Sequence, residues 1–249
     1  MTAALHIPDF ALRYGRASAE ALAETLWPTR CAVCDAMGDV LCDRCRSQLA
    51  YIDWWRACPR CGAPFGRTQC TECNDVTLAS MGRTEPALDG LANAVALDRA
   101  ASRVVRNWKD AGERRLATTM AAIMAPYLPP AWQSLQPTVV PIPASPQARC
   151  RRGFDHGAEL ARAVADRLAL PFAPVLDRPR TRDQRALTRR SRVANMQGRF
   201  RTLPGATAPA AVLLVDDVCT TGATLFAAAD ALRAAGTATC HALTFARTW

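Results

Sequence analysis

Eight of the eleven cysteines lie in one short segment, and their spacing is the strongest constraint on how this chain can fold. They form four pairs, and two residues separate the cysteines within each pair: Cys31/Cys34, Cys42/Cys45, Cys58/Cys61 and Cys70/Cys73. Two thiolates on either side of a tight turn can bind one tetrahedral zinc ion, and a site closed by four thiolates is structural. We therefore predict a structural zinc module over residues 31–73 that holds one or two zinc ions.

The sequence leaves open how the four pairs combine. Adjacent pairs can share an ion, or the pairs can alternate along the chain. The alternative to zinc is a redox-active dithiol, or a set of ordinary thiols in a small core. Few strongly apolar residues lie between the pairs, so we expect metal binding to supply much of the folding free energy of the module.

The composition is that of a folded protein. Half of the residues are hydrophobic and 21% are charged, which excludes a disordered or fibrous chain. No stretch approaches the roughly 20 consecutive apolar residues of a membrane helix. Residues 1–30, predicted to form a helical lead-in, lack the pattern of a signal peptide. We therefore expect a cytoplasmic protein without a transmembrane segment.

Beyond residue 73 the pattern changes to that of an α/β domain. Residues 74–90 are a predicted linker, and residues 91–249 alternate between strand and helix patterns. Strands are expected at 91–97, 138–142, 211–215 and 238–245, and helices at 102–109, 113–124, 156–168 and 223–234. This alternation predicts a mainly parallel sheet with helices on both faces, which binds ligands at the carboxyl ends of its strands.

One strand end carries the most specific motif of the chain. An apolar run leads into Asp216 and Asp217, and a hydroxyl-rich turn then opens a helix. The N–H groups, hydroxyls and positive helix end of such a turn suit a phosphate, and two adjacent carboxylates suit vicinal sugar hydroxyls. We therefore predict a phosphorylated ribose as ligand; the alternative is a plain strand-turn-helix with a capping threonine. The residues of the turn are Thr220, Thr221, Gly222, Ala223 and Thr224.

This segment resembles the phosphoribosyl pyrophosphate (PRPP) motif of type I phosphoribosyltransferases. The order of motifs over residues 25–248 is similar to that of the ComF family, whose members are associated with natural competence and DNA uptake. The resemblance implies an α/β fold in which a small N-terminal Cys-rich zinc module precedes a phosphoribosyltransferase-like (Rossmann-like) domain with a parallel sheet. The motifs that carry it are the Cys-rich module, Arg106–Lys109, Val140–Pro143, Arg151–His156 and the segment from Gln184 to Phe200.

The resemblance also implies roles for individual residues. Asp216 and Asp217 would hold the ribose hydroxyls at the catalytic centre, and the turn of residues 220–224 would bind the 5'-phosphate. Mg²⁺ would accompany PRPP. An arginine cluster suits the pyrophosphate because guanidinium groups fork onto phosphate oxygens, and a solvated basic loop is the alternative. The residues expected on the pyrophosphate side are Lys109, which is the only lysine of the chain, Pro141, Arg149, Arg151 and Arg152.

Most of the formal net charge of +9 comes from residues 178–201, which hold nine arginines and one acid, Asp183. This segment resembles the mobile loop that such enzymes close over their site; the alternative is a surface helix rich in arginine. The arginines would repel one another unless an anion bridges them, so we expect a polyanionic partner. The residues expected to contact the site or nucleic acid are Arg182, Gln184, Arg185, Arg189 and Arg192.

Three functions are compatible with these residues. The first is transfer of the phosphoribosyl group of PRPP to an unknown acceptor. The second is binding of PRPP or ribose 5-phosphate together with single-stranded DNA in DNA uptake, with a competence helicase or another DNA-processing protein as partner. The third is a PRPP-sensing regulator without turnover.

Overall fold

The structure is a computed structural model that describes residues 25, 28–80, 82–178 and 200–248. The chain divides into two compact units between Ser47 and Gln48. In the first unit, Arg30 and Met37 form an isolated antiparallel bridge that closes the loop around the first CxxC pair. Helix α2 (Asp43–Ser47) follows and carries Cys45 on its buried side.

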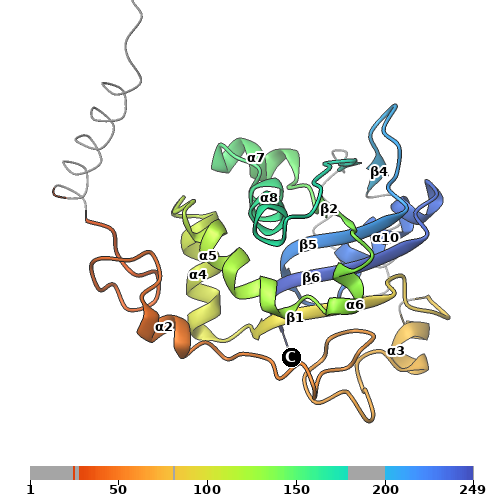
Figure 1. The fold of residues 1–249 in the computed structure, drawn as a ribbon, viewed down its shortest axis with the longest axis horizontal. Coiled ribbons are helices and arrows are strands. Elements are labelled where there is room, and N and C mark those ends of the chain that lie inside the picture. The colour runs from red at the N-terminus through yellow and green to blue at the C-terminus, as the bar shows by residue number, and fades with distance from the viewer. Residues whose placement is uncertain (1–24, 26–27, 81, 179–199, 249) are drawn as a thin grey trace, which may run out of the picture. The chain divides into compact units, whose positions relative to one another are not determined.

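The larger unit is built on a sheet of four parallel strands in the order β1-β6-β5-β2 (Figure 1). The two central strands are largely buried, which explains the continuous apolar run in the first five residues of β5. Because all four strands are parallel, their carboxyl ends meet at one edge of the sheet. The strands are β1 (Gly90–Ala96), β2 (Thr138–Pro141), β5 (Ala211–Cys219) and β6 (Thr239–Arg247).

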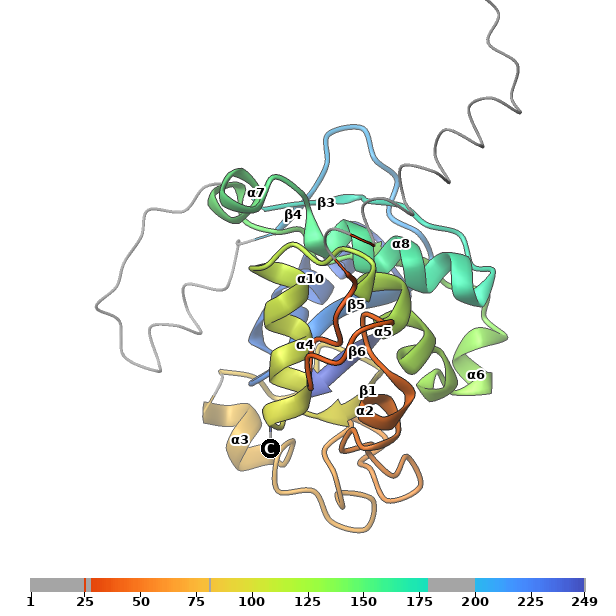
Figure 2. The ribbon, with the colours of Figure 1, turned by 90° about the vertical axis from the view of Figure 1, so that its left-hand side faces the viewer.

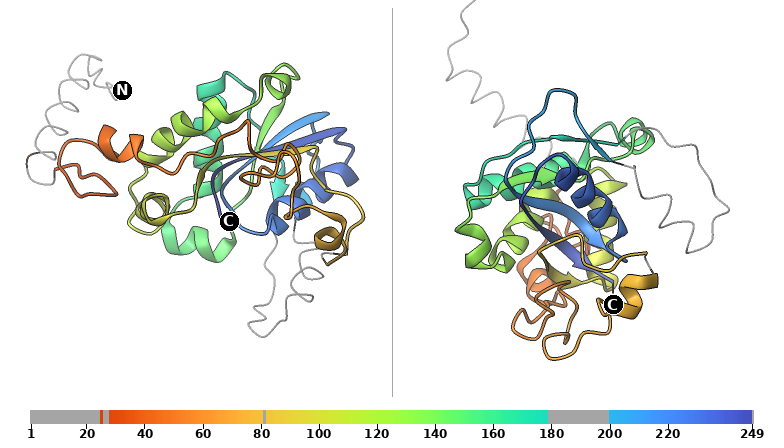
Figure 3. Two further views of the ribbon diagram at one scale, coloured as in Figure 1. Left: turned by 90° about the horizontal axis from the view of Figure 1, so that it is seen from below. Right: turned by 90° about the vertical axis from the view of Figure 1, so that its right-hand side faces the viewer.

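Helices cover both faces of this sheet. On one face lie α4 (Arg99–Lys109), α5 (Leu116–Met124) and α8 (His156–Leu168), and on the other lies α10 (Ala223–Ala234) (Figures 2 and 3). Helix α8 contacts β2 and β5, and α10 contacts β5 and β6. The α/β class predicted from the sequence is therefore confirmed.

Several short elements have no counterpart in the sequence analysis. They are α3 (Asp75–Ser80), the 3-10 helix η1 (Ala125–Tyr127), α6 (Pro130–Gln133), α7 (Pro146–Arg152), and the antiparallel pair β3 (Leu176–Asp177) and β4 (Arg201–Thr202). Among the helices of the described residues, none has both the length and the apolar composition needed to cross a membrane.

Two element boundaries differ from the prediction in ways that matter for the site. Helix α4 begins three residues earlier than expected, because the Asp98 side chain caps it by accepting a hydrogen bond from Ala101 N at 2.8 Å. Strand β5 continues four residues beyond Val215, because β6 pairs with it as far as Cys219. The two adjacent aspartates therefore lie within the strand rather than after it.

Both edges of the sheet are covered by irregular segments. At the β1 edge, Ile52 N donates to Ala94 O at 3.0 Å and Ala96 N donates to Ala50 O at 2.8 Å. At the β2 edge, Val139 N donates to Pro171 O at 2.7 Å. This pairing removes the exposed strand edges that would otherwise recruit other chains.

Helix α8 approaches the sheet so closely that only glycine fits at its start. A Cβ on Gly157 would lie 2.0 Å from Ile142 O, just beyond the end of β2. We expect Gly157→Ala to lower the free energy of unfolding by about 1–3 kcal/mol, because the helix has to move away from the strand. Urea denaturation measures the loss. Asp166→Ala, at an exposed position of the same helix, is the control, and equal stabilities of the two variants would contradict the prediction.

Candidate functional site

The two aspartates near the end of β5 are held by different contacts. The Asp217 side chain is 5% exposed, and its Oδ2 atom lies 2.6 Å from Lys109 Nζ at the end of α4. The neighbouring Asp216 is half-buried, and its Oδ1 accepts a hydrogen bond from Asp217 N at 2.9 Å. The only lysine of the chain therefore neutralises the second carboxylate of the pair.

This arrangement changes the protonation of the first carboxylate. Burial and the adjacent charge of Asp217 raise the pKa of Asp216 well above its ordinary value, and the charge of Lys109 opposes them. Asp216 thus holds its proton more strongly than a free aspartate. A group that brings positive charge or hydrogen-bond donors to this edge stabilises its ionised form.

The turn after β5 presents the start of a helix to the same edge of the sheet. Gly222 is the residue before α10 and has φ 74° and ψ −2°, a left-handed conformation that favours glycine. Having no side chain, Gly222 cannot cap the helix itself. Thr220 and Thr221 are exposed, and Thr221 Oγ1 accepts from Ala223 N at 3.4 Å. The N–H groups of the first helical turn and two hydroxyls are thus presented together, which is the chemistry of an anion site.

A basic pocket of about 550 Å³ adjoins the lysine. Arg152, whose side chain is 13% exposed, pairs with Asp110 at 3.1 Å, while the more exposed Arg151 lies 4.0 Å from the same carboxylate. The pocket therefore holds three cationic side chains and one acid. Its lining residues are Lys109, Asp110, Ala111, Gly112, Arg151, Arg152 and Phe154.

His156 lies behind this pocket and is a neutral hydrogen-bond acceptor. Its ring packs edge-on against Trp108 at 5.6 Å, and its Nδ1 lies 3.2 Å from Arg152 Nη1. Burial first, and then the charges of Lys109 and Arg152, lower the pKa of His156 to about 4. The histidine therefore orients Arg152 without adding a charge at neutral pH.

The structure brings only some of the predicted site residues together. Lys109, Arg151 and Arg152 share the basic pocket, whereas Arg149 is directed toward Asp155 at 3.9 Å and does not line it. Pro141 is buried at the end of β2. Asp110 was missed by the sequence analysis, although an acid directly after the only lysine was a visible signal. The predicted loop residues Arg182, Gln184, Arg185, Arg189 and Arg192 lie outside the described residues.

The eight paired cysteines form two separate clusters. In each cluster the four sulfur atoms lie within 4.8 Å of one another. The first cluster combines Cys31 and Cys34 with Cys42 and Cys45, and the second combines Cys58 and Cys61 with Cys70 and Cys73. Adjacent pairs therefore share a site, which decides between the two arrangements that the sequence left open.

The surroundings of these thiols fit a metal ion. Although burial opposes it, backbone N–H groups of residues 34, 42 and 33 lower the pKa of Cys31 to about 6. Burial and neighbouring sulfurs raise the pKa of Cys45 to about 12. Four thiols so close together cannot all ionise on their own, whereas a divalent cation stabilises all four thiolates. The two clusters are thus suited to two structural zinc ions.

Comparison with known families agrees with this geometry. Residues 22–77 match the model of the double zinc ribbon domain, and residues 155–248 match the model of the phosphoribosyl transferase domain. The chain combines a double zinc ribbon with a phosphoribosyltransferase domain. This combination supports a ComF-like architecture. A comparison with curated proteins found no match.

The ion pair at the centre of the phosphoribosyltransferase domain can be tested by a double-mutant cycle. We expect Lys109→Met to lower the free energy of unfolding by about 3–5 kcal/mol, because it leaves the Asp217 carboxylate buried without a cation. Adding Asp217→Asn to this variant is expected to restore most of the loss. Urea denaturation of the wild type, the two single variants Lys109→Met and Asp217→Asn, and the double variant gives the coupling energy.

Arg201→Met is the control for this cycle. It breaks an ion pair with Asp177 in which the arginine side chain is 64% exposed, so we expect a loss below about 1 kcal/mol. A loss in Lys109→Met that persists unchanged in the double variant would show that lysine packing, rather than charge pairing, stabilises this region.

Proposed function

We propose that this chain is a ComF-type protein that binds PRPP or ribose 5-phosphate with Mg²⁺ at the carboxyl end of β5. One observation carries the proposal: Lys109 lies between the aspartate pair and the basic pocket and contributes to both. The groups proposed to bind the sugar hydroxyls and the diphosphate thereby adjoin one another, and the turn proposed to bind the phosphate directly follows the strand that carries the aspartates. PRPP has all three groups, and ribose 5-phosphate has the hydroxyls and the phosphate.

Each part of the site has a role in this proposal. Asp216 and Asp217 accept hydrogen bonds from the ribose hydroxyls, and the turn of residues 220–224 holds the 5'-phosphate through N–H groups and hydroxyls. Arg151 and Arg152 form bidentate hydrogen bonds with the diphosphate, and Mg²⁺ bound with PRPP would offset the remaining charge of the diphosphate. When the ligand binds, the ribose hydroxyls take the place of Lys109 at the Asp217 carboxylate. Lys109 then pairs with the diphosphate instead of with Asp217. This exchange avoids the cost of a buried, unpaired charge.

The same site supports transfer chemistry. The bond between ribose C1 and the diphosphate oxygen breaks, and its electron pair leaves with the oxygen. The nucleophile of an acceptor then forms the new bond to C1 and releases its proton to solvent. Arginines that neutralise the departing diphosphate lower the barrier to this step. A transferase of nucleotide metabolism and a PRPP-sensing regulator without turnover are the two alternative roles for this site.

Binding can be measured directly by calorimetric titration of the full chain with PRPP and Mg²⁺. We expect a single site, and an affinity at least tenfold weaker in the Asp216→Asn/Asp217→Asn variant, a loss of about 1.4 kcal/mol or more. Asp166→Asn, on the exposed side of α8, should bind like the wild type. A wild-type chain that binds neither PRPP nor ribose 5-phosphate would refute the proposal. Release of diphosphate on prolonged incubation distinguishes turnover from binding alone.

A second candidate function is single-stranded DNA binding in DNA uptake. It is supported by exposed aromatic residues just before the second cysteine cluster and between its two CxxC pairs. Trp54 and Trp55 are 66% and 53% exposed, and their rings lie 6.0 Å apart. Phe65 is 57% exposed, with the Arg56 guanidinium 5.9 Å from its ring centroid. Exposed rings beside a guanidinium suit stacked bases and a phosphate backbone. In this role, the partner proteins would be a competence helicase or another DNA-processing protein.

Anisotropy of a labelled single-stranded oligonucleotide tests this function over a salt series. We expect Trp54→Ala/Trp55→Ala to weaken binding by roughly 5- to 150-fold, the effect of about 1–3 kcal/mol for a stacked base. The logarithm of the binding constant should fall by about 0.7 per phosphate contact for each tenfold rise in salt. Val76→Ala, at another exposed apolar residue, is the control. Binding that is independent of salt would exclude a phosphate-tracking surface.

A further inference from the structure

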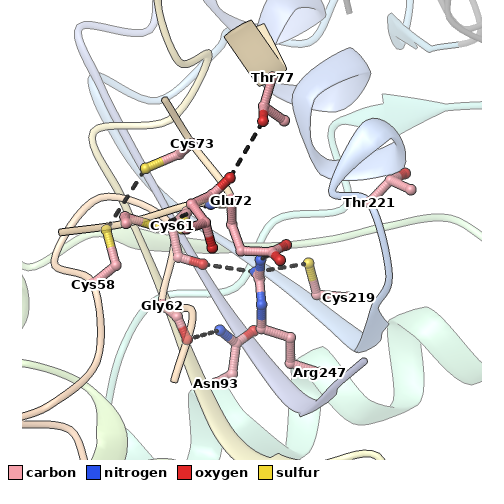
Figure 4. A network of polar contacts seen from close by, with 12 residues as sticks. Cys58, Cys61, Gly62, Glu72, Cys73, Thr77, Asn93, Cys219, Thr221 and Arg247 are labelled. Carbon is pink, nitrogen blue, oxygen red and sulfur yellow. Dashed lines mark hydrogen bonds and ion pairs between the residues drawn. The ribbon is translucent and has the colours of Figure 1, made fainter. Parts of the chain in front are cut away.

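A buried arginine at the end of β6 lies between the second cysteine cluster and the candidate phosphate turn. The Arg247 side chain is 5% exposed. Its Nη1 donates to Cys61 O at 2.7 Å and lies 3.5 Å from Cys219 Sγ, and its Nη2 lies 3.5 Å from Glu72 Oε2 (Figure 4). One guanidinium thus contacts both the segment of the second cysteine cluster and the end of β5, which are far apart in the sequence.

The three contacted residues belong to two functional parts of the domain. Cys61 is a cluster cysteine, and Glu72 lies between Cys70 and Cys73, so Arg247 contacts both CxxC pairs of the second cluster. Cys219 is the last residue of β5, directly before the phosphate turn, and pairs with Arg247 in the sheet register. Its thiol is 2% exposed, and burial raises its pKa to about 11, so it acts as a packing group.

The second cluster is also fixed on the sheet independently of this arginine. Gly62 has φ 64°, and a Cβ there would lie 2.4 Å from Leu91 O. Asn93 Nδ2 donates to Gly62 O at 3.1 Å, and Thr244 Oγ1 donates to Asn93 Oδ1 at 2.6 Å. The turn after Cys61 therefore packs closely against β1 and is hydrogen-bonded through Asn93 to β6. A change in the conformation of that turn moves Cys61 O, the carbonyl oxygen that accepts the hydrogen bond from Arg247.

The guanidinium has few other ways to satisfy its charge. Its Nε is buried and has no hydrogen-bond partner among the described residues. If Cys61 O turned away, Arg247 would keep only the longer contacts to Glu72 and Cys219. A buried cation that loses its best acceptor is costly, so the side chain moves toward a new partner. Such a movement displaces Cys219 and, with it, the start of the phosphate turn.

We propose that Arg247 is a positioning residue that makes the conformation of the phosphate turn depend on zinc at the second cluster. Zinc bound by Cys58, Cys61, Cys70 and Cys73 would hold the turn that carries Cys61 O; this carbonyl positions Arg247, and Arg247 positions Cys219 at the end of β5. The proposal rests on the proposed function, because its consequence is that zinc at this cluster strengthens the binding of ribose 5-phosphate.

Hydrogen exchange of the full chain tests the positioning role without any ligand. We expect Arg247→Met to speed exchange of the amides of residues 220–224 at least tenfold relative to amides of α8, with Arg247→Lys between it and the wild type. Arg233→Met is the matched control, because Arg233 also joins a backbone carbonyl, Ala87 O at 3.1 Å, to a carboxylate, Asp89 at 2.8 Å, but does so away from the turn. Equal exchange of the turn in Arg247→Met and Arg233→Met would overturn the proposal.

The zinc dependence is tested through a ligand cysteine of the second cluster. We expect Cys70→Ser to lower zinc content, to speed exchange of residues 220–224 and to weaken ribose 5-phosphate binding about tenfold. Cys150→Ser, at an exposed cysteine outside both clusters, should change none of these. If Arg247 carries the effect, adding Arg247→Met to Cys70→Ser weakens binding no further.

The outcomes separate this proposal from the function on which it rests. Additive effects of Cys70→Ser and Arg247→Met on exchange would show two independent defects and would exclude Arg247 as the link. A wild-type chain that binds no ribose 5-phosphate would refute the proposed function, while the exchange measurements would still decide whether Arg247 links the cluster to the turn. Circular dichroism identifies a variant that is unfolded, in which case Arg247→Lys supplies the comparison.

Discussion

The ion pair between Lys109 and Asp217 connects the parts of the candidate site. The lysine comes from the end of α4 and the aspartate from β5, and both side chains are largely removed from water. Each charge is stable there because of the other. Since Lys109 also lines the basic pocket, a ligand that separates this pair, as in the proposed function, has to offer donors to Asp217 and an anion to Lys109. A sugar with hydroxyl and phosphate groups meets both requirements.

The two cysteine clusters have different relations to the rest of the fold. The first belongs to a small unit whose described residues bury only Leu41 and a few cysteine or polar side chains, so a metal ion has to replace an apolar core. The second belongs to the same compact unit as the sheet, with Gly62 docked against Leu91 and with Arg247 reaching Cys61 O. The second half of the double zinc ribbon is therefore structurally part of the compact unit that contains the sheet.

Sequence patterns predicted the long elements well because burial imposes a regular period on them. Helices α8 and α10 have the predicted bounds, and β1 is displaced by one residue. Short elements such as α7 were missed, because seven residues rich in arginine carry no apolar period. The extension of β5 to Cys219 was also missed, since it depends on pairing with β6 rather than on local sequence.

The sequence alone determined the local chemistry: the paired thiols, the two adjacent aspartates, the hydroxyl-rich turn and the excess of arginine. These features consist of residue types and their spacing along the chain, so the sequence is sufficient to recognise them. Only the tertiary structure decided that adjacent cysteine pairs share a cluster, that Lys109 pairs with Asp217 and that Arg247 joins Cys61 to Cys219. The two charge contacts involve residues that the packing of the parallel sheet brings together, and the energy of a buried charge depends on which partners lie within a few ångströms rather than on their order in the chain.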